Sequence, residues 1–281
     1  MPYNVQIIAD SIAVSRLTTF EITMPKMVVA EFNTHCMIAR NSASSRAIPV
    51  ERILAAVESD PVIPEFGLNG AGMQARVVLE GWHAQAALEG WLGARDSACI
   101  QARRLLGIGV HKQVTNRLLE PWMFTTIVAT AEDRTWRWFF KLRCAPDAQP
   151  EIRKAALLMR DAYEVSVPQP FHAREDYHFS SQWHLPYIDY DHDALPMRET
   201  GTFSWMNLAY RSAARCARIS YLRQHEERAA ASEIERANDL IKCGHWSPLE
   251  HQAVPCTTPQ RGKFRYWAQL RHQIGDGFEE T

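Results

Sequence analysis

The stretch that decides the fold lies near the start of the chain, where residues 4–24 read NVQIIADSIAVSRLTTFEITM. It is rich in valine, isoleucine, threonine and phenylalanine, which are typical of strands. The composition therefore predicts two strands, over Asn4–Val14 and Thr18–Met24. The fold thus begins with a sheet.

Most of the following chain shows apolar residues at helical spacing. Pro49 marks the start of one helix, because proline suits the first helical position. Met73–Leu106 contains three glycines and predicts two helices or one bent helix. Further strands are predicted over Met123–Thr130 and His251–Cys256. Helices are predicted over residues 26–36, 111–119, 136–143, 149–165, 205–221 and 230–243.

This arrangement predicts an α+β fold, with a mostly antiparallel sheet and flanking helices, as one domain over residues 1–281. Residues 166–200 differ from the rest, because they are rich in Pro, His, Asp, Tyr and Trp and have weak periodicity. We expect a long surface segment there that acts as a lid or as a subunit contact.

Composition excludes several classes of protein. The formal net charge of the 281 residues is -1, which lacks the basic excess expected for binding a nucleic-acid polymer. The chain has no apolar run of about 18 residues and no signal peptide, so we expect no membrane span and a cytoplasmic location. The six cysteines form no CxxC pair, which indicates reduced thiols and no cysteine-based zinc site.

One polar cluster occupies residues 34–46, which read THCMIARNSASSR. Arginine offers a planar set of donors for phosphate, and serine hydroxyls add neutral donors. The cluster therefore predicts an anion site, although a solvated loop explains it as well.

Two other clusters carry polar groups at places where apolar helices end. Arg143 follows such a helix and suits a phosphate, or alternatively the helix dipole. Ala217–Ser220 (ARIS) and Ser247–His251 (SPLEH) suit the polar edges of a ligand, or alternatively ordinary helix capping.

Together these clusters resemble the flavin-dependent thymidylate synthase family. His35, followed by Ser44 and Arg46, is similar to its Arg-His-Arg, seven residues, Ser signature. Arg143 with the downstream Ala-Gln-Pro-Glu-Ile run resembles its Leu-Arg…Ala-Gln-x-Glu-Ile block. ARIS and SPLEH resemble its Ala-Arg-Val-Ser and Ser-Pro-Phe-Glu-His blocks, and residues 111–121, with Arg117, resemble its Ala-Arg-x-x-Leu-Pro segment.

The chain departs from the family pattern in order and in chemistry. ARIS and SPLEH usually open the family chain but stand near the end here, which resembles a circularly permuted branch that includes the UMP/dUMP methylase of the polyoxin antibiotic pathway. Thr34 and Cys36 occupy the two arginine positions of the signature. Arg40, one helical turn later, is a candidate to compensate. Glu31 stands where the family has glutamine.

The resemblance implies a methyltransferase that adds a methyl group to C5 of UMP or dUMP. It implies FAD as cofactor, NADPH and methylenetetrahydrofolate as co-substrates, no protein nucleophile, no metal, and a homotetramer with shared sites. Ser44 and Arg143 are expected to act in catalysis. The expected substrate contacts are Glu31, Ser44, Ser45, Arg46, Arg117 and Arg143. The expected FAD contacts are His35, Arg40, Arg134, Ser220, Ser247 and Glu250.

Three alternatives remain open from the sequence. One is an ordinary dTMP synthase for DNA precursors, which differs in its tolerance of the ribose 2′-hydroxyl. Another is a nucleotide- or flavin-binding protein without catalysis, suggested by Thr34 and Cys36. A third is a metal enzyme that uses the acidic run over Asp189–Asp193, for which an acidic surface loop is the simpler explanation.

Overall fold

The computed structural model describes residues 3–176 and 181–275. A five-stranded sheet has the order β3-β4-β2-β1-β5, and its neighbouring strands are antiparallel except for β1 and β5. A smaller antiparallel pair joins β6 to β7. The strands are β1 (Asn4–Ile12), β2 (Arg16–Pro25), β3 (Ala39–Ser42), β4 (Phe124–Glu132), β5 (Gln169–Pro170), β6 (Ala253–Pro255) and β7 (Trp267–Gln269). The predicted α+β class with a mostly antiparallel sheet is confirmed.

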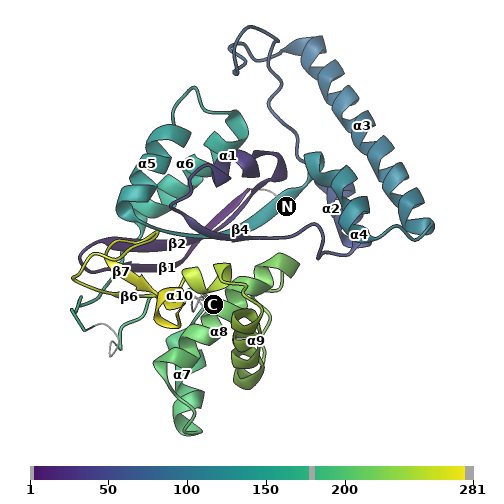
Figure 1. The fold of residues 1–281 in the computed structure, drawn as a ribbon. Helices are drawn as coiled ribbons and strands as arrows, with labels where there is room; N and C mark the ends of the chain where they lie inside the picture. Colours follow the sequence, from purple (N-terminus) through teal and green to yellow (C-terminus); the bar gives the residue numbers. More distant parts are fainter. Residues whose placement is uncertain (1–2, 177–180, 276–281) are drawn as a thin grey trace, which may run out of the picture.

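Helices cover both faces of the large sheet (Figure 1). α1, α5 and α6 lie on one face, α8 and α9 lie on the other, and α3 runs along the outside of the molecule. The helices are η1 (Lys26–Val28), α1 (Val29–Asn33), α2 (Val50–Ser59), α3 (Gly81–Gly107), α4 (Lys112–Thr115), η2 (Asn116–Trp122), α5 (Asp133–Arg143), α6 (Pro150–Val165), α7 (Tyr190–Glu199), α8 (Trp205–Arg218), η4 (Ile219–Tyr221), α9 (Ala230–Lys242), η5 (Ser247–Glu250) and α10 (Leu270–Gln273).

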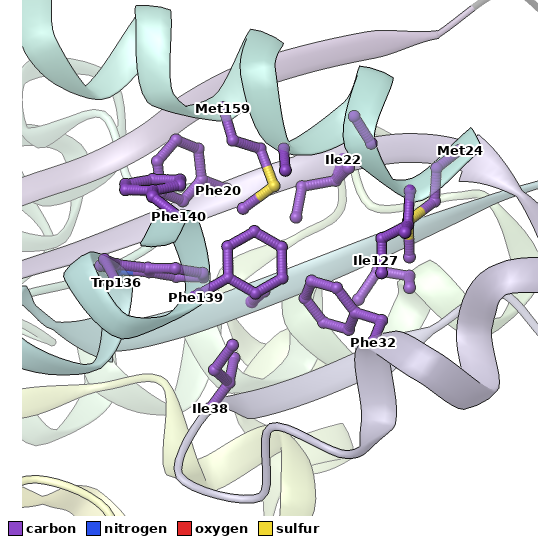
Figure 2. Close-up of a cluster of buried hydrophobic side chains, with 14 of the residues drawn as sticks. Phe20, Ile22, Met24, Phe32, Ile38, Ile127, Trp136, Phe139, Phe140 and Met159 are labelled. Atoms are coloured by element: carbon purple, nitrogen blue, oxygen red, sulfur yellow. The ribbon is translucent and has the colours of Figure 1, made fainter. Parts of the chain in front are cut away.

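The apolar face of the sheet packs against α1, α5 and α6. Phe20, Ile22 and Met24 alternate along β2 because successive side chains of a strand point to opposite faces. Figure 2 shows them beside aromatic side chains of α5, among them Trp136, whose ring centroid lies 5.0 Å from that of Phe20 in an edge-on contact. Each such buried side chain contributes about 1.5–3 kcal/mol. This cluster is the main core of the molecule.

The other face of the sheet is polar, and yet it is buried. Thr19 and Glu21 of β2 point to it, as does Thr130 of β4, and all three side chains are nearly inaccessible to solvent. The hydroxyls of Thr19 and Thr130 lie 2.7 Å apart, and Tyr187 donates a hydrogen bond of 2.6 Å to Glu21 Oε2. The polar groups on this face therefore find partners in one another and in the segment that covers them.

The helices that cover the polar face are joined by buried ion pairs. Asp193 of α7 accepts from Arg211 (2.7 Å) and Arg215 (2.6 Å) of α8. Glu233 of α9 accepts from Arg211 (2.8 Å), Arg215 (3.0 Å) and Arg218 (2.7 Å). Burial alone would raise the pKa of Asp193 and of Glu233, but the arginines outweigh burial and lower both pKa values. This network fixes α7, α8 and α9 to one another.

Several elements differ from the sequence predictions. α3 is one helix that continues through Gly90 and Gly93, and it begins at Gly81 rather than near Met73. Each internal glycine costs about 1 kcal/mol, which packing against α2 and η2 offsets. The helix predicted over residues 111–119 is α4 followed by η2, which continues to Trp122 and contains Pro121. The short strands β3, β5 and β7 were not predicted, because two to four residues carry too little periodicity.

The segment over residues 166–200 contains helix α7, where the sequence predicted an irregular surface segment. Asp189 caps the helix by accepting from the backbone N–H groups of Asp191 (3.0 Å) and His192 (3.2 Å). Residues 177–180 lie outside the described part. Among the helices of residues 3–176 and 181–275, none is both long and apolar enough to cross a membrane.

Candidate active site

A cavity of about 810 Å³ opens on the polar side of the sheet. Its lining comes from the end of β3 and the loop after it, from α4, from η4, from α9, and from the turn before η5. None of the residues that line it is acidic, whereas three are arginine or lysine. The lining residues used below are Asn41, Ser44, Arg46, Lys112, Ser220, Arg236 and Ser247.

Hydrogen bonds join the distant segments that form the cavity. The backbone N–H of Ser44 donates to the carbonyl of Ser220 at 3.0 Å, which ties the loop after β3 to η4. The side chains of Asn41 and Ser247 are hydrogen-bonded at 3.1 Å. The first polar cluster of the sequence therefore meets both the ARIS and the SPLEH segments at one place.

No carboxylate of the described chain forms an ion pair with the three cations that line the cavity. Arg46 and Arg236 are exposed side chains that form no ion pair within residues 3–176 and 181–275. Lys112 donates through Nζ to the carbonyl of Ala47 at 2.9 Å, a neutral partner. Three cations without a nearby carboxylate favour an anionic ligand, such as a phosphate.

A second group of candidate residues surrounds Arg143 at the end of α5. Arg143 Nε donates to His35 Nε2 at 3.0 Å, and Nη2 donates to the carbonyl of Glu31 at 2.9 Å and to Thr34 Oγ1 at 3.0 Å. Arg40 donates to the backbone carbonyls of Asn33, His35 and Ile38, which closes the turn between α1 and β3. Both arginines therefore hold the end of α1.

This Arg143 group keeps some unused hydrogen-bonding capacity. Burial, and then Arg143 and Arg40, lower the pKa of His35 to about 4, so its imidazole is neutral and accepts at Nε2. Arg143 Nη1 makes no hydrogen bond within the described residues, and Glu31 Oε2 is buried without a partner there. A ligand that reaches this group would meet the free N–H groups of Arg143 Nη1, whereas Glu31 Oε2 is closed off from solvent.

Four further candidates lie apart from both groups. Ser45 and Arg117 both donate to Glu120 Oε1, at 2.7 and 2.8 Å, and the Ser45 side chain is buried there. Glu250 accepts from Lys263 and Arg271, each at 2.6 Å, and so ties η5 to the C-terminal segment. Arg134 is exposed on the first turn of α5.

The two groups lie on opposite sides of the large sheet. Arg40 and Asn41 are neighbours in β3, so their side chains point to opposite faces. Arg40 joins the Arg143 group, whereas Asn41 joins the cavity. In one chain the structure therefore brings Ser44, Arg46, Ser220 and Ser247 together, and it brings Glu31, His35, Arg40 and Arg143 together elsewhere.

The sequence reasoning did not select three cavity residues, Asn41, Lys112 and Arg236. Asn41 lies inside the THCMIARNSASSR run and was available as a polar residue of that cluster. Lys112 lies in the segment 111–121, whose resemblance to the family pointed to Arg117, and Arg236 belongs to a helix that gave no chemical signal of its own. Only the packing of α4 and α9 around the loop after β3 places them at the cavity.

The acidic run considered for a metal has other roles. Asp189 caps α7, and Asp193 is buried against Arg211 and Arg215. It is therefore a helix start and a structural ion pair, where a surface loop was expected. Among the described residues, no group of three or more His, Cys, Asp or Glu side chains is arranged to hold a metal ion.

The sequence profile of the family described as thymidylate synthase complementing protein matches residues 12–169, more than half of the chain. The match contains β2 to β4, α5, α6 and the Arg143 group, and it ends before ARIS and SPLEH. A search of curated proteins gave no match.

Two solved structures show a distant likeness, both of the UMP/dUMP methylase PolB from Streptomyces cacaoi. The complex with 5-Br dUMP is 16% identical, covers 57% of this chain and 89% of its own, and has a TM-score of 0.48. The complex with 5-Br UMP is 18% identical, covers 57% of this chain and 88% of its own, and has a TM-score of 0.46. At these low scores the likeness carries no further argument.

Proposed function

Because the chain belongs to the thymidylate synthase complementing protein family, we propose that it is a flavin-dependent methyltransferase acting on C5 of UMP or dUMP. Thymidylate synthesis is itself the C5 methylation of a uracil nucleotide, so the family sets the reaction class. The observation that carries the proposal is the cavity in which Ser44 and Arg46 meet Ser220 and Ser247 beside three cations without a carboxylate.

The nucleotide phosphate suits the Ser44 and Arg46 side of the cavity. Arg46 is free of ion pairs in the described chain, so its planar donors are available to a phosphate. Ser44 adds a hydroxyl at the start of a turn. Its carbonyl accepts hydrogen bonds there from the backbone N–H groups of Ala47 and Ile48. A ligand held at this point is anchored by charge and oriented by neutral donors.

The residues present also fit FAD. A volume of about 810 Å³ is within the range of cofactor pockets, and Lys112 and Arg236 offer positive charge for a diphosphate. When bound, FAD would supply the reducing equivalents from NADPH and help to pass on the one-carbon unit of methylenetetrahydrofolate. Ser220 and Ser247 provide hydroxyls for its polar edges. The protein's tasks are then binding, orientation and polarisation of the uracil carbonyls.

We assign the Arg143 group to the same site across a subunit boundary, in a homotetramer. The support is an apolar surface beside the group: Met37, Trp138 and Leu142 are 45%, 58% and 55% exposed. Trp138 and Leu142 are four residues apart and so share one face of α5. Association through this face would carry the free donors of Arg143 to a neighbouring cavity.

The decisive experiment measures the product. Purified protein is incubated with FAD, NADPH, methylenetetrahydrofolate and either UMP or dUMP, and the nucleotide is analysed by mass spectrometry. A gain of one CH2 unit is expected, and a protein that remains colourless with added FAD and releases no tritium from C5-labelled nucleotide would contradict the proposal. Arg46→Ala should remove turnover while the exposed Arg137→Ala control keeps it.

The same assay separates the second candidate function, an ordinary dTMP synthase for DNA precursors. Product from dUMP alone would support that function, whereas product from UMP would support a ribonucleotide methylase of the kind found in nucleoside antibiotic biosynthesis. The family membership favours C5 methylation in both cases, and the ribose 2′-hydroxyl is the only chemical difference between the two substrates.

A further inference from the structure

A chain of buried hydrogen bonds leads from the cavity across the sheet. It begins at Asn41, whose amide lies 3.0 Å from His251 Nε2. His251 Nδ1 lies 2.8 Å from Thr130 Oγ1, and that hydroxyl lies 2.7 Å from Thr19 Oγ1. The first half of the chain thus joins a cavity residue to the polar faces of β4 and β2.

The hydrogen-bond chain continues along the polar face of the sheet to β1. Thr19 Oγ1 lies 2.7 Å from His184 Nε2, and His184 Nδ1 lies 2.9 Å from Ser11 Oγ of β1. Burial lowers the pKa of both His184 and His251 to about 3, so both imidazoles are neutral. A neutral imidazole has one donor and one acceptor nitrogen, so each link fixes the direction of the next.

The direction of the chain follows from the surroundings of Asn41. The amide is satisfied when Nδ2 faces two backbone carbonyls, those of Ser247 at 3.0 Å and Arg40 at 3.2 Å, which can only accept. In this orientation Oδ1 accepts from Ser247 Oγ at 3.1 Å, and Nδ2 faces His251 Nε2 at 3.0 Å. Nδ2 shares two hydrogens among these three acceptors and cannot itself accept, so His251 Nε2 is unprotonated, and Nδ1 carries the proton and donates to Thr130.

The remaining links agree with this direction. Thr130 then donates to Thr19, Thr19 donates to His184 Nε2, and His184 Nδ1 donates to Ser11 Oγ. In this direction each imidazole and each threonine hydroxyl of the hydrogen-bond chain has a partner with the matching role, and the carbonyls of Ser247 and Arg40 oppose reversal of the Asn41 amide, because they would then face its oxygen. Asn41 Oδ1 retains a second lone pair, because Ser247 uses only one.

We propose that Asn41 recognises a ring imide N–H of the ligand through Oδ1, and that the chain from His251 to Ser11 positions Asn41 for this contact. The proposal rests on the function proposed above. Uracil and the flavin ring both carry an imide N–H between two carbonyls, so the shared chemistry is the imide. An amide turned the other way would present an NH2 group and repel that N–H.

The first test compares binding of UMP and FMN with binding of their N3-methylated analogues, measured by calorimetry on the full-length protein. Methylation of the ring that Asn41 contacts should lower affinity by about tenfold or more, since it leaves a buried acceptor unpaired. The ligand that loses affinity on N3-methylation is the one whose ring contacts Asn41. In Asn41→Ala the difference between parent and methylated ligand should vanish.

The outcomes of this test are distinct. Equal binding of parent and methylated forms for both ligands would overturn the role of Asn41. A discrimination that survives in Asn41→Ala would also overturn it, because steric exclusion would then explain the loss. Failure of the unaltered protein to bind either parent would overturn the proposed function instead.

The second test addresses positioning from a distance. Thr130→Val keeps the shape of the side chain but removes the hydroxyl in the middle of the chain, and Thr130→Ser is the matched control that restores it. Valine should lower the discrimination against the methylated ligand several-fold, whereas serine should keep it. Unchanged discrimination in a folded Thr130→Val protein would overturn the positioning role.

A measurement on the unaltered protein completes the test whether or not the valine variant folds. The ¹⁵N chemical shifts of His251 report which ring nitrogen carries the proton. The Nδ1–H tautomer is expected without ligand. An Nε2–H tautomer would reverse the chain, turn the Asn41 amide around and overturn the proposal.

Discussion

The two faces of the large sheet are both buried, but they are stabilised in different ways. One face places Phe20, Ile22 and Met24 against aromatic residues of α5, and contacts of this kind have little directional preference. The other face places Thr19 and Thr130 in a directed chain of hydrogen bonds beneath α8 and the segment before α7. The first face supplies most of the stability, whereas the second orients side chains toward the cavity.

The candidate site residues divide in the same way. The Arg143 group lies at the edge of the apolar face, where the ends of α1 and α5 meet, and most of its donors are already in use. The cavity group lies on the polar side, and two of its arginines have no ion-pair partner in the described chain. One group is therefore mainly structural within a single chain, and the other is available to a ligand.

The largest effect is expected from Trp136→Ala on the apolar face. Trp136 is fully buried, and its Nε1 donates to the carbonyl of Thr18 at 3.2 Å. Loss of the ring should lower the free energy of unfolding by about 3–5 kcal/mol, as measured in urea. Trp138→Ala, on the exposed side of the same helix, is the control and should change protomer stability by less than about 0.5 kcal/mol.

Acid should weaken the polar face next most strongly. The pKa of His184 and of His251 is about 3 in the folded chain, chiefly because of burial, and about 6.5 when unfolded. The unfolded chain therefore binds protons first, so stability is complete above about pH 6.5 and declines down to about pH 3. Each histidine should remove about 2 kcal/mol between pH 7 and 5.

The control for this prediction is His251→Gln, which removes one of the two titrating imidazoles. The variant starts with lower stability at pH 7, but its decline toward pH 5 should be smaller by the contribution of one histidine. An identical decline in both proteins would mean that His251 is not neutral in the fold. Lys263 lowers the pKa of His251 as a second cause, so Lys263→Met should leave the decline between pH 7 and 5 unchanged and end it at a slightly higher pH.

Arg46→Ala tests the cavity group through binding. We expect about 10- to 100-fold weaker UMP binding, the usual effect of losing hydrogen bonds to a charged group, and an unchanged free energy of unfolding. Calorimetry and urea unfolding measure the two quantities. A stability loss without a binding loss would assign Arg46 to the fold instead.

Arg143→Ala should show a different balance. It removes three hydrogen bonds that hold the end of α1, so the free energy of unfolding should fall by about 1–2 kcal/mol. The chain should remain folded and assembled, and turnover should be lost. Full activity would remove Arg143 from the site, and Arg143→Lys is the control that keeps the charge without the planar donors.

The smallest effect is expected from Arg134→Ala. Arg134 is exposed on the first turn of α5, where the helix dipole disfavours a positive charge, so its removal should change stability by less than about 0.5 kcal/mol. Flavin affinity, measured by fluorescence quenching, should fall only in the assembled protein. A loss of affinity in a dissociated protomer would place its contact within one chain.

The long elements were predictable, because their periodicity repeats several times. β1, β2, β4, α2, α6 and α9 occur close to the predicted ranges, and so does the start of α8. The short strands were missed, because a few residues give no periodic signal. Helix α7 was missed, because Pro196 lies within it and partners elsewhere stabilise it. Asp193, for example, is helical and buried only because α8 supplies Arg211 and Arg215.

The amino-acid sequence by itself determined the alternation along residues 19–24, and with it a sheet that has one apolar and one polar face. It also determined which polar clusters carry the chemistry of a nucleotide site. Only the tertiary structure decided that the polar face is buried, that Asn41 and Arg40 serve opposite sides, and that Lys112 and Arg236 reach the cavity. The physical reason is range: strand periodicity is set between neighbouring residues, whereas burial and charge at a site depend on segments more than two hundred positions apart.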